Sequence, residues 1–172
     1  DIGGTKIDAA RVDSEGCIVD RCRVLTKGSD SETLFDNLVA MVNPLLARGE
    51  LGGCGVGCGG PMVSGGEEVS PLNIPQWRNF PLRARLAEQL GMPVAVDNDA
   101  KALALAEGRL GAAVGISNYI ALVVSTGVGA GIVADGRLLH GRLGNAGHIG
   151  HVVVDHGGPA CACGGRGCLE AL

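Results

Sequence analysis

The sequence predicts an α/β protein with an aliphatic core, and three observations carry this prediction. Strand-like and helix-like hydrophobic patterns alternate along the 172 residues. The hydrophobic share is 46%, yet the chain has only one Trp, one Tyr and two Phe, so Val, Leu, Ile and Ala must fill the core. Thirty glycines stand in short clusters between apolar runs, well above the usual share of about 7%, and predict tight turns and backbone-lined sites.

Composition and the chain ends exclude several classes of protein. A net charge of −4 provides no basic surface for nucleic acid. No run of about 18 apolar residues occurs, so no membrane span is expected, and no secretory signal is visible. We therefore expect a cytoplasmic protein.

The chain opens at Asp1 without a Met and closes on what resembles the first turn of a helix, so we expect a fragment truncated at both ends.

Turn residues and hydrophobic spacing divide the first hundred residues into elements. Asp30 or Ser31 can cap the first helix, and Pro44 predicts a kink or an early end in it. Trp77 is interpreted as a core anchor rather than as a sugar platform. The expected elements are a hairpin over 1–26, an amphipathic helix over 31–48, a short strand and glycine loop over 51–61, an irregular proline-rich loop over 69–81, a short helix over 81–91 and a strand over 94–97.

A strand-to-helix junction carries the acidic sequence Asp97-Asn98-Asp99. These residues could form a plain helix cap or a catalytic corner. The following helix, 100–110, places Leu103, Ala106 and Leu110 on one face. The glycine-containing break at 111–115 is the expected boundary between two lobes, 1–113 and 114–172. Beyond it we expect a strand over 116–125, a glycine loop over 125–131, a strand over 132–134 and a turn at 135–136.

Two glycine turns carry groups that suit phosphate. DIGGTK at 1–6 offers backbone N–H groups, a hydroxyl and a Lys, and STGVGAG at 125–131 repeats the small residues and a Thr. Both sit in strand–glycine–strand hairpins, which places Thr5 and Thr126 at the hairpin tips. Each could be an ordinary glycine turn, since DIGGTK matches neither the Walker A spacing nor G-x-G-x-x-G. Two such hairpins facing each other would form a clamp around a polyphosphate.

Three of the seven cysteines crowd into eight residues and predict a metal site. Cys161, Cys163 and Cys168 on a glycine-rich loop, with one imidazole, would form a closed tetrahedral zinc site of the structural type. His148, His151 and His156 all remain possible as the fourth ligand, and free thiols or a disulfide are the alternative. The scattered cysteines are expected to be buried free thiols: 17, 22, 54 and 58.

The assembled motifs resemble those of the ROK family, a bacterial group of sugar kinases and sugar-responsive repressors. The resemblance rests on DIGGTK at 1–6, GCGGP at 57–61, LNIPQW at 72–77, DNDAKALALAEG at 97–108, STGVGAG at 125–131 and AGHIGHVVV at 146–154 with CACGGRGCLE at 161–170. It implies a two-lobed sugar kinase of the actin-like, ribonuclease-H-like ATPase fold, roughly twice the length of this chain, that phosphorylates a hexose at its 6-hydroxyl with ATP and Mg²⁺. It also implies a homodimer.

The resemblance further implies a role for each matching residue. Asp99 would be the general base. Asp1 would help to hold Mg²⁺, and His151 would complete a structural Zn²⁺ site with Cys161, Cys163 and Cys168. The phosphates would lie against Gly3, Gly4, Thr5, Lys6, Thr126 and Gly127. The sugar would be contacted by Asn98, His148, His151, Glu170, Gly60 and Asn73.

Two positions depart from the family pattern. His148 stands where the family usually has Glu, which alters the sugar contacts near the anomeric carbon, and Lys101 replaces a more usual Asn. The alternative function is a sugar-sensing repressor of the same family whose DNA-binding domain precedes this fragment. The intact glycine turns and Asp99 favour the kinase. The sequence leaves the sugar, and ATP versus polyphosphate as the donor, open.

Overall fold

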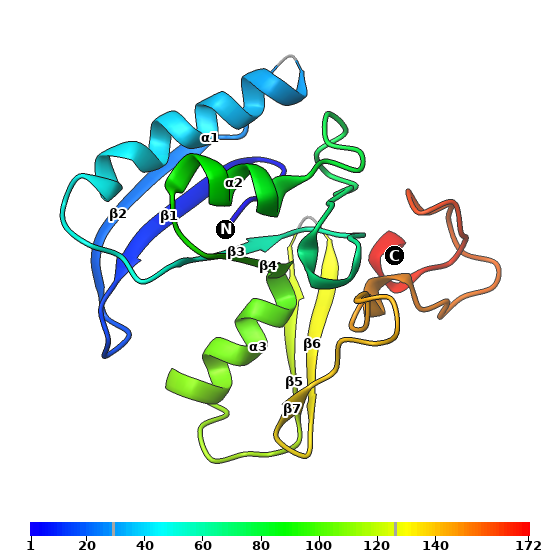
Figure 1. Ribbon diagram of the computed structural model, residues 1–172. Helices are drawn as coiled ribbons and strands as arrows, with labels where there is room; N and C mark the ends of the chain where they lie inside the picture. The colour runs from blue at the N-terminus through cyan, green and yellow to red at the C-terminus, as the bar shows by residue number, and fades with distance from the viewer. Residues whose placement is uncertain (29, 126) are drawn as a thin grey trace. The chain divides into compact units, whose positions relative to one another are not determined.

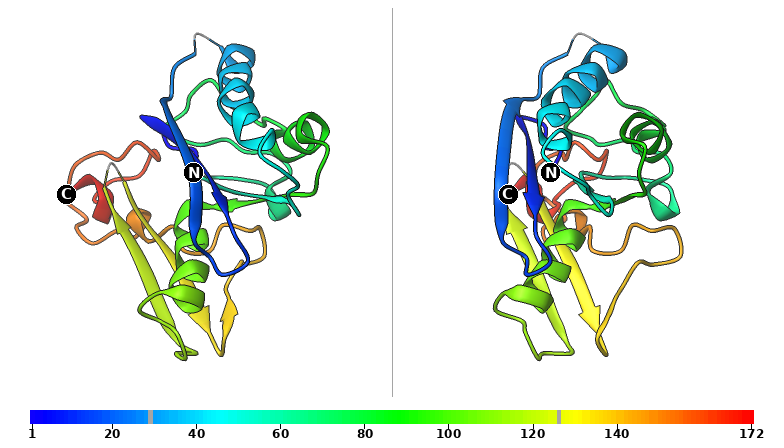
Figure 2. Two further views of the ribbon diagram at one scale, coloured as in Figure 1. Left: turned by 90° about the vertical axis from the view of Figure 1, so that its left-hand side faces the viewer. Right: turned by 60° about the vertical axis from the view of Figure 1, so that its left-hand side comes forward.

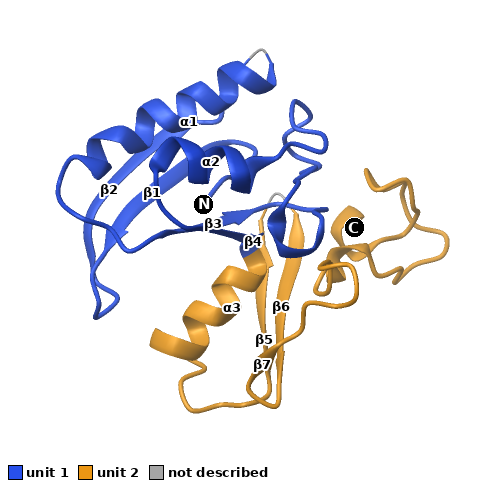
Figure 3. Ribbon diagram, viewed as in Figure 1, with its two compact units in different colours: residues 1–99 blue, residues 100–172 orange. Residues whose placement is uncertain are grey.

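The structure, a computed structural model, describes residues 1–28, 30–125 and 127–172. Its helices and strands confirm the predicted α/β class (Figure 1). The described residues form two compact units, Asp1–Asp99 and Ala100–Leu172 (Figure 3). This division falls at the strand-to-helix junction. The expected lobe boundary near residue 113 refers to the lobes of a whole protein and stays a prediction.

Unit 1 begins with an antiparallel hairpin, β1 (Lys6–Val12) and β2 (Ile18–Leu25). Its turn is closed by the Asp13 carboxylate, which accepts the N–H groups of Glu15 and Cys17. The expectation that Thr5 lies at the tip of this hairpin is wrong. The Gly3–Gly4–Thr5 turn precedes β1, because Ile2 folds back to bridge Ile7.

A parallel strand pair completes the sheet of unit 1. β3 (Cys54–Cys58) runs beside β4 (Val94–Asn98), with Cys58 opposite Asn98. Ile2 joins this pair to the hairpin, because it also forms a parallel bridge with Cys58. The turn after Ile2 and the carboxyl ends of β3 and β4 therefore lie at one edge of the sheet.

Helices α1 (Ser31–Leu46) and α2 (Leu82–Leu90) lie on the same face of these strands (Figure 2). The Asp30 carboxylate caps α1 by accepting the Thr33 N–H at 2.8 Å. Pro44 does not end α1 at once, since the helix continues to Leu46 and buries Leu45. α2 ends at Gly91, whose φ of +64° is the left-handed cap that glycine adopts at low cost.

The core of unit 1 is built on the loop between β3 and α2. Trp77 is fully buried and stacks on Phe80 with ring centroids 4.7 Å apart. Its indole N–H donates to the Ser31 carbonyl at 3.3 Å. Trp77 thus ties the irregular loop to the start of α1, which confirms its prediction as a core anchor. The same cluster contains Ile2, Ile7, Leu34, Phe35, Leu38, Met41, Val69, Ile74, Leu82, Leu86 and Val96.

Unit 2 packs α3 (Asp99–Leu110, whose first residue belongs to unit 1) beside an antiparallel sheet. The sheet has the order β5 (Tyr119–Val124), β6 (Val128–Ala134), β7 (Arg137–Leu138). Asp135 and Gly136 have φ of +50° and +73°, which confirms the tight turn between β6 and β7.

The buried face of α3 differs from the expected one. Of the expected face, Leu103 is partly buried against the core of unit 2, but Ala106 and Leu110 are exposed. The helix fully buries Ala100, Lys101 and Ala104 instead. The reason is the close approach of β6, where a Cβ added at Gly131 would collide with Ala104. Backbones this close select small residues, so side-chain size outweighs hydrophobicity here.

Long loops fill the rest of unit 2, with single 3₁₀ turns at Ile149–His151 and Leu169–Ala171. Bridges between Val153 and Cys168 and between Ala160 and Arg166 fold the last loop onto itself. In the described part of the chain, every helix is too short or too polar to cross a membrane.

Candidate functional site

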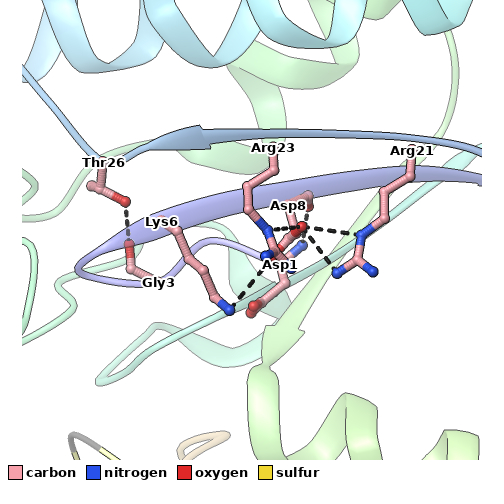
Figure 4. A network of polar contacts seen from close by, with 7 residues as sticks. All are labelled: Asp1, Gly3, Lys6, Asp8, Arg21, Arg23 and Thr26. Atoms are coloured by element: carbon pink, nitrogen blue, oxygen red, sulfur yellow. Dashed lines mark hydrogen bonds and ion pairs between the residues drawn. The ribbon is translucent and has the colours of Figure 1, made fainter.

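The Gly3–Gly4–Thr5 turn is fixed to β2 from one side. The Thr26 hydroxyl donates to the Gly3 carbonyl at 2.6 Å (Figure 4). The Thr26 N–H donates to the Thr5 carbonyl at 2.9 Å. The turn is closed by the Gly3 N–H, which donates to the Lys6 carbonyl at 3.0 Å. Thr5 and Lys6 are exposed, so a rigid turn presents a hydroxyl and an ammonium to solvent.

Beside this turn, Asp8 gathers three cations on the exposed face of the hairpin (Figure 4). Its carboxylate lies 2.7 Å from Arg23 Nε, 3.1 Å from Arg21 and 3.9 Å from Lys6 Nζ. The hydrogen bond from Arg23, together with that from Arg21, holds the pKa of the Asp8 carboxyl below its ordinary value. The Lys6 side chain stays half exposed, and its distance to Asp8 is too long for a tight hydrogen bond.

Three predicted binding segments of unit 1 meet at the carboxyl edge of β3. A Cβ added at Gly4 would lie 2.8 Å from Asn73 Cβ, and one added at Gly59 would lie 3.2 Å from Asn73 Oδ1. The Gly60 carbonyl accepts the Leu72 N–H at 3.2 Å, which fastens the neighbouring loop there. A side chain at position 4 would collide with the loop that carries Asn73, and one at position 59 would press on the Asn73 amide. The structure thus brings segments 3–6, 59–60 and 73 together.

The acidic corner follows directly on this edge. Asn98 is the last residue of β4 and Asp99 the first of α3, and both are half-buried. The Asp97 carboxylate accepts the Asn98 N–H at 2.8 Å, so Asp97 braces the turn as expected. Burial, and to a smaller degree the negative charge of Asp99, raises the pKa of the Cys58 thiol to about 12. Because Cys58 pairs with Asn98 in the parallel strands, Asp99 follows β4 at the same edge at which segment 59–60 follows β3.

The second predicted phosphate turn belongs to unit 2 and connects β5 with β6. Thr126 lies outside the described residues. A Cβ added at Gly127 would lie 2.5 Å from Glu170 Oε2, and the same oxygen accepts the Val128 N–H at 2.7 Å. Glu170, predicted as a sugar contact, is thus held against the backbone of this turn. No local sequence pattern indicates this bond, because the two residues are far apart in the chain.

His148 presents one free ring nitrogen. Its Nδ1 lies 2.8 Å from the Asn145 carbonyl oxygen. A carbonyl can only accept, so Nδ1 carries the proton and Nε2 of the neutral ring is an acceptor. Nε2 is buried and has no hydrogen-bond partner among the described residues. The ring centroid of His148 lies 6.4 Å from that of His151.

Residues 151–170 form a segment that we call the cysteine loop, and it contains four metal-binding side chains. The donor atoms of His151, Cys161, Cys163 and Cys168 all lie within 4.8 Å of one another. Cys163 Sγ lies 3.7 Å from Cys168 Sγ, and Cys161 Sγ lies 3.7 Å from His151 Nδ1. In a tetrahedral site with Zn–S bonds of about 2.3 Å, the donor atoms are separated by roughly this distance. The cluster therefore fits a zinc ion.

Of the three histidines left open by the sequence, His151 is the one in this cluster. His156 is exposed, and the Nδ1 of His148 is bonded elsewhere. The scattered cysteines are free thiols as expected. Of these four, Cys58 is buried as expected, Cys22 and Cys54 are only partly buried, and Cys17 is exposed at the hairpin turn. Burial raises the pKa of Cys168 to about 11, whereas a backbone N–H from Gly165 lowers that of Cys163.

One residue near these loops was not assigned a strong effect from the sequence. Lys101 is fully buried and donates to the Gly144 carbonyl at 2.5 Å. A signal existed, because Lys101 lies three residues from Ala104 and next to Ala100, on the small-residue face of its helix.

Comparison with known proteins gives one consistent family. The sequence model of the ROK family matches residues 1–172. Over the whole chain, a glucokinase of Halalkalibacterium halodurans is 40% identical and an N-acetylmannosamine kinase of Citrobacter koseri is 39% identical. The chain spans 54% and 59% of the lengths of these relatives.

Solved structures agree with the sequence relatives. A ROK family glucokinase of Streptomyces griseus, in complex with glucose and AMPPNP, is 37% identical with a TM-score of 0.90, and the match covers 98% of this chain and 54% of that one. A ROK family transcriptional regulator, a homologue of the E. coli MLC protein, is 29% identical with a TM-score of 0.84 over 98% of this chain and 44% of the regulator. The fold is thus that of the ROK sugar kinases, the actin-like ATPase fold.

Proposed function

Because the chain belongs to the ROK family, we propose that its protein transfers the γ-phosphoryl group of ATP to the 6-hydroxyl of a hexose, either glucose or a related sugar. The observation that carries this proposal is the edge of unit 1 where a glycine turn, segment 59–60 and the Asn98–Asp99 corner meet. This arrangement would bring a base, an amide and backbone N–H groups for phosphate to one place.

Asp99 is the general base of the proposed reaction. Its carboxylate accepts the proton of the sugar hydroxyl while that oxygen attacks the γ-phosphorus and the bond to the bridging oxygen of ADP breaks. Phosphoryl transfer depends mainly on positioning and on charge neutralisation. Asp99 is the first residue of α3, so its carboxylate is held at the strand-to-helix junction.

The phosphates of ATP are assigned to the two glycine turns. Gly3, Gly4, Thr5 and Lys6 supply donors from unit 1, and Thr126 and Gly127 supply them from unit 2. Mg²⁺ is assigned to Asp1, whose exposed carboxylate suits an ion that keeps several waters and takes one or two protein oxygens. Bound Mg²⁺ would offset the negative charge of the phosphates.

The sugar is assigned to the polar groups of six residues: Asn98, Gly60, Asn73, His148, His151 and Glu170. His148 offers a neutral acceptor at Nε2, where a carboxylate would offer a charged one. This difference bears on sugar choice. The curated relatives, a glucokinase and N-acetylmannosamine kinases, mark the range to be tested.

A structural zinc is assigned to His151, Cys161, Cys163 and Cys168. Three thiolates and an imidazole leave no open position for catalysis, so the ion would stiffen the loop between His151 and Glu170. Two proposed sugar contacts are then held by one metal.

The test is a substrate panel on the full-length protein. Glucose, mannose, N-acetylglucosamine and N-acetylmannosamine are offered with ATP, and separately with polyphosphate, and ADP or sugar phosphate is measured. We expect one or two of these sugars to be phosphorylated with ATP. If none reacts with either donor while the protein is folded and carries zinc, the kinase proposal fails.

The second candidate function is a sugar-sensing repressor. The similarity to a ROK family transcriptional regulator supports it. A repressor would bind one of the four sugars without turnover and would bind DNA through residues preceding Asp1. Isothermal titration with each sugar, alongside the kinase assay, separates the two candidates.

A further inference from the structure

A buried lysine of unit 2 has no part in the phosphoryl transfer proposed above. Lys101 stands in the first turn of α3 with 0% of its surface exposed. Among the described residues it is the only charged one in the buried class. A lysine normally keeps its ammonium in water, and burial of the charge is costly unless polar groups receive it. The groups that Lys101 contacts should therefore explain its position.

The ammonium of Lys101 holds a loop. It donates to the Gly144 carbonyl at 2.5 Å. Gly144 is buried and has a φ of +82°, so the chain makes a tight bend there. The far end of the loop is fixed to β6, because the Ala130 N–H donates to the Gly147 carbonyl at 2.8 Å. Residues 144–147 are thus anchored to α3 at one end and to the sheet at the other.

The residue after this loop is His148, and its ring depends on the same backbone. The Asn145 carbonyl, which accepts from His148 Nδ1 at 2.8 Å, belongs to the peptide that follows the Gly144 carbonyl. If Gly144 shifts, the Asn145 carbonyl shifts with it, and the bond that selects the Nδ1–H tautomer weakens. The unpartnered Nε2 would then lose its fixed direction and its acceptor character.

We propose that Lys101 is a positioning residue for the sugar: through Gly144 and Asn145 it fixes the orientation and tautomer of His148, so that Nε2 presents a bare acceptor to a hydroxyl or amide N–H of the substrate. The proposal rests on the proposed function for the assignment of His148 to the sugar. The link from Lys101 to the tautomer of His148 stands on the structure of unit 2 alone.

The test is a double-mutant cycle on the full-length protein with Lys101→Met and His148→Ala. Methionine keeps the length of the side chain and removes its donors. We expect Lys101→Met to raise the KM for the sugar about 10-fold, measured with glucose or N-acetylmannosamine, whichever reacts better. This is the effect of losing one hydrogen bond between His148 Nε2 and the sugar. The KM for ATP should stay within about 2-fold of wild type, because uniform binding of the sugar alone is affected.

The cycle distinguishes positioning from general support of the fold. If Lys101 acts through His148, the double variant is no worse than His148→Ala alone. Val133→Ala is the matched control, since Val133 is buried in unit 2 beside Ala104 and Ala121 and truncation lowers stability without touching the loop. Additive effects in the cycle, or an equal rise in sugar KM for Val133→Ala, would overturn the proposal.

A spectroscopic readout keeps the two proposals separable. The ¹⁵N shifts of the His148 ring report its tautomer whether or not any sugar reacts. We expect Nδ1–H in the wild type and a move toward the other tautomer in Lys101→Met. An unchanged tautomer refutes the positioning role, even where the kinase assay succeeds. If Lys101→Met does not fold, Lys101→Gln takes its place. Glutamine retains a donor on a shorter side chain, so the His148 ring should move only partly toward the other tautomer.

Discussion

At the scale of single residues, the corner 97–99 gives adjacent polar side chains different tasks. Asp97 braces the turn through the Asn98 N–H, and Asn98 ends the strand opposite Cys58. Asp99 opens a helix, at the end where the backbone dipole favours a negative charge. Of the two carboxylates, Asp99 is the one that we propose as the base.

We predict that Asp99→Asn lowers kcat of the full-length kinase by about 10²–10⁴-fold, the usual contribution of a general base. An amide cannot accept the proton at neutral pH. The coupled ADP assay measures kcat. Asp36→Asn is the matched control, because Asp36 is an exposed residue of α1, and it should keep wild-type activity. Zinc content should be unchanged in both variants. Near-normal turnover of Asp99→Asn would remove the assigned base.

A second residue-scale prediction concerns Asp8 and pH. Its carboxyl pKa is lowered in the folded state from 3.8, first by the hydrogen bond from Arg23, so the unfolded chain binds the proton more readily. The stabilisation is therefore present above about pH 4 and is lost as the pH falls through the lower folded pKa. Its size should not exceed about 1 kcal/mol, because the two arginines are half exposed.

The measurement compares urea unfolding of wild type and Asp8→Asn at pH 7 and pH 3. The difference in unfolding free energy should be largest at pH 7 and should shrink at pH 3. A difference that grows toward acid would contradict the ion-pair account of Asp8.

At the scale of elements, the cysteine loop has little regular structure of its own. Two isolated bridges, single 3₁₀ turns and backbone hydrogen bonds, such as that from the Gly167 N–H to the Pro159 carbonyl, hold it. Val152, Val153 and Val154 are 45–55% exposed. A segment with so little buried apolar surface needs another source of order. The Cys₃His cluster supplies one if it binds zinc.

We predict that Cys163→Ser releases the zinc and lowers the midpoint of thermal unfolding. Cys163 is exposed, so the loss of stability would come from the metal and not from a cavity. Metal analysis should fall from about one zinc per chain toward none. Cys17→Ser, an exposed free cysteine outside the cluster, is the control and should keep its zinc. Full occupancy in Cys163→Ser would rule out the site.

The glycines of unit 2 provide another element-scale prediction. Gly147 has a φ of +97°, and an added Cβ would collide with the Ala130 carbonyl, whereas Gly115 has a φ of +80° and open space. Gly115→Ala should cost about 1–2 kcal/mol of backbone strain. Gly147→Ala should cost more, because the loop must also leave β6. Urea unfolding of the two variants compares them, and equal costs would show that the contact with Ala130 adds nothing.

At the scale of the molecule, unit 2 presents an apolar face. Ile120, Leu122 and Val124 alternate along β5 and are 57%, 56% and 77% exposed. The chain spans only about half the length of its curated relatives. We predict that the 172-residue segment expressed alone binds a hydrophobic dye and does not phosphorylate sugar. A protein of the relatives' length should phosphorylate sugar and should not bind the dye. Turnover by the isolated segment would show that it carries a complete nucleotide site.

Much of this protein is determined by its sequence alone. Hydrophobic period, caps and turn residues are local, so the hairpin, three helices and the separate strands β3 and β4 could be predicted within a few residues. Three cysteines close in sequence cannot lie far apart, so the metal loop was predictable as well.

Only the tertiary structure decided what depends on contacts between distant residues. It moved Thr5 away from the hairpin tip and turned α3 so that Ala100 and Ala104, rather than Ala106 and Leu110, are buried. It also placed the ammonium of Lys101 on the Gly144 carbonyl, 43 residues away. Local patterns encode the elements, but pairing and burial depend on which backbones approach closely, and a single sequence does not state that.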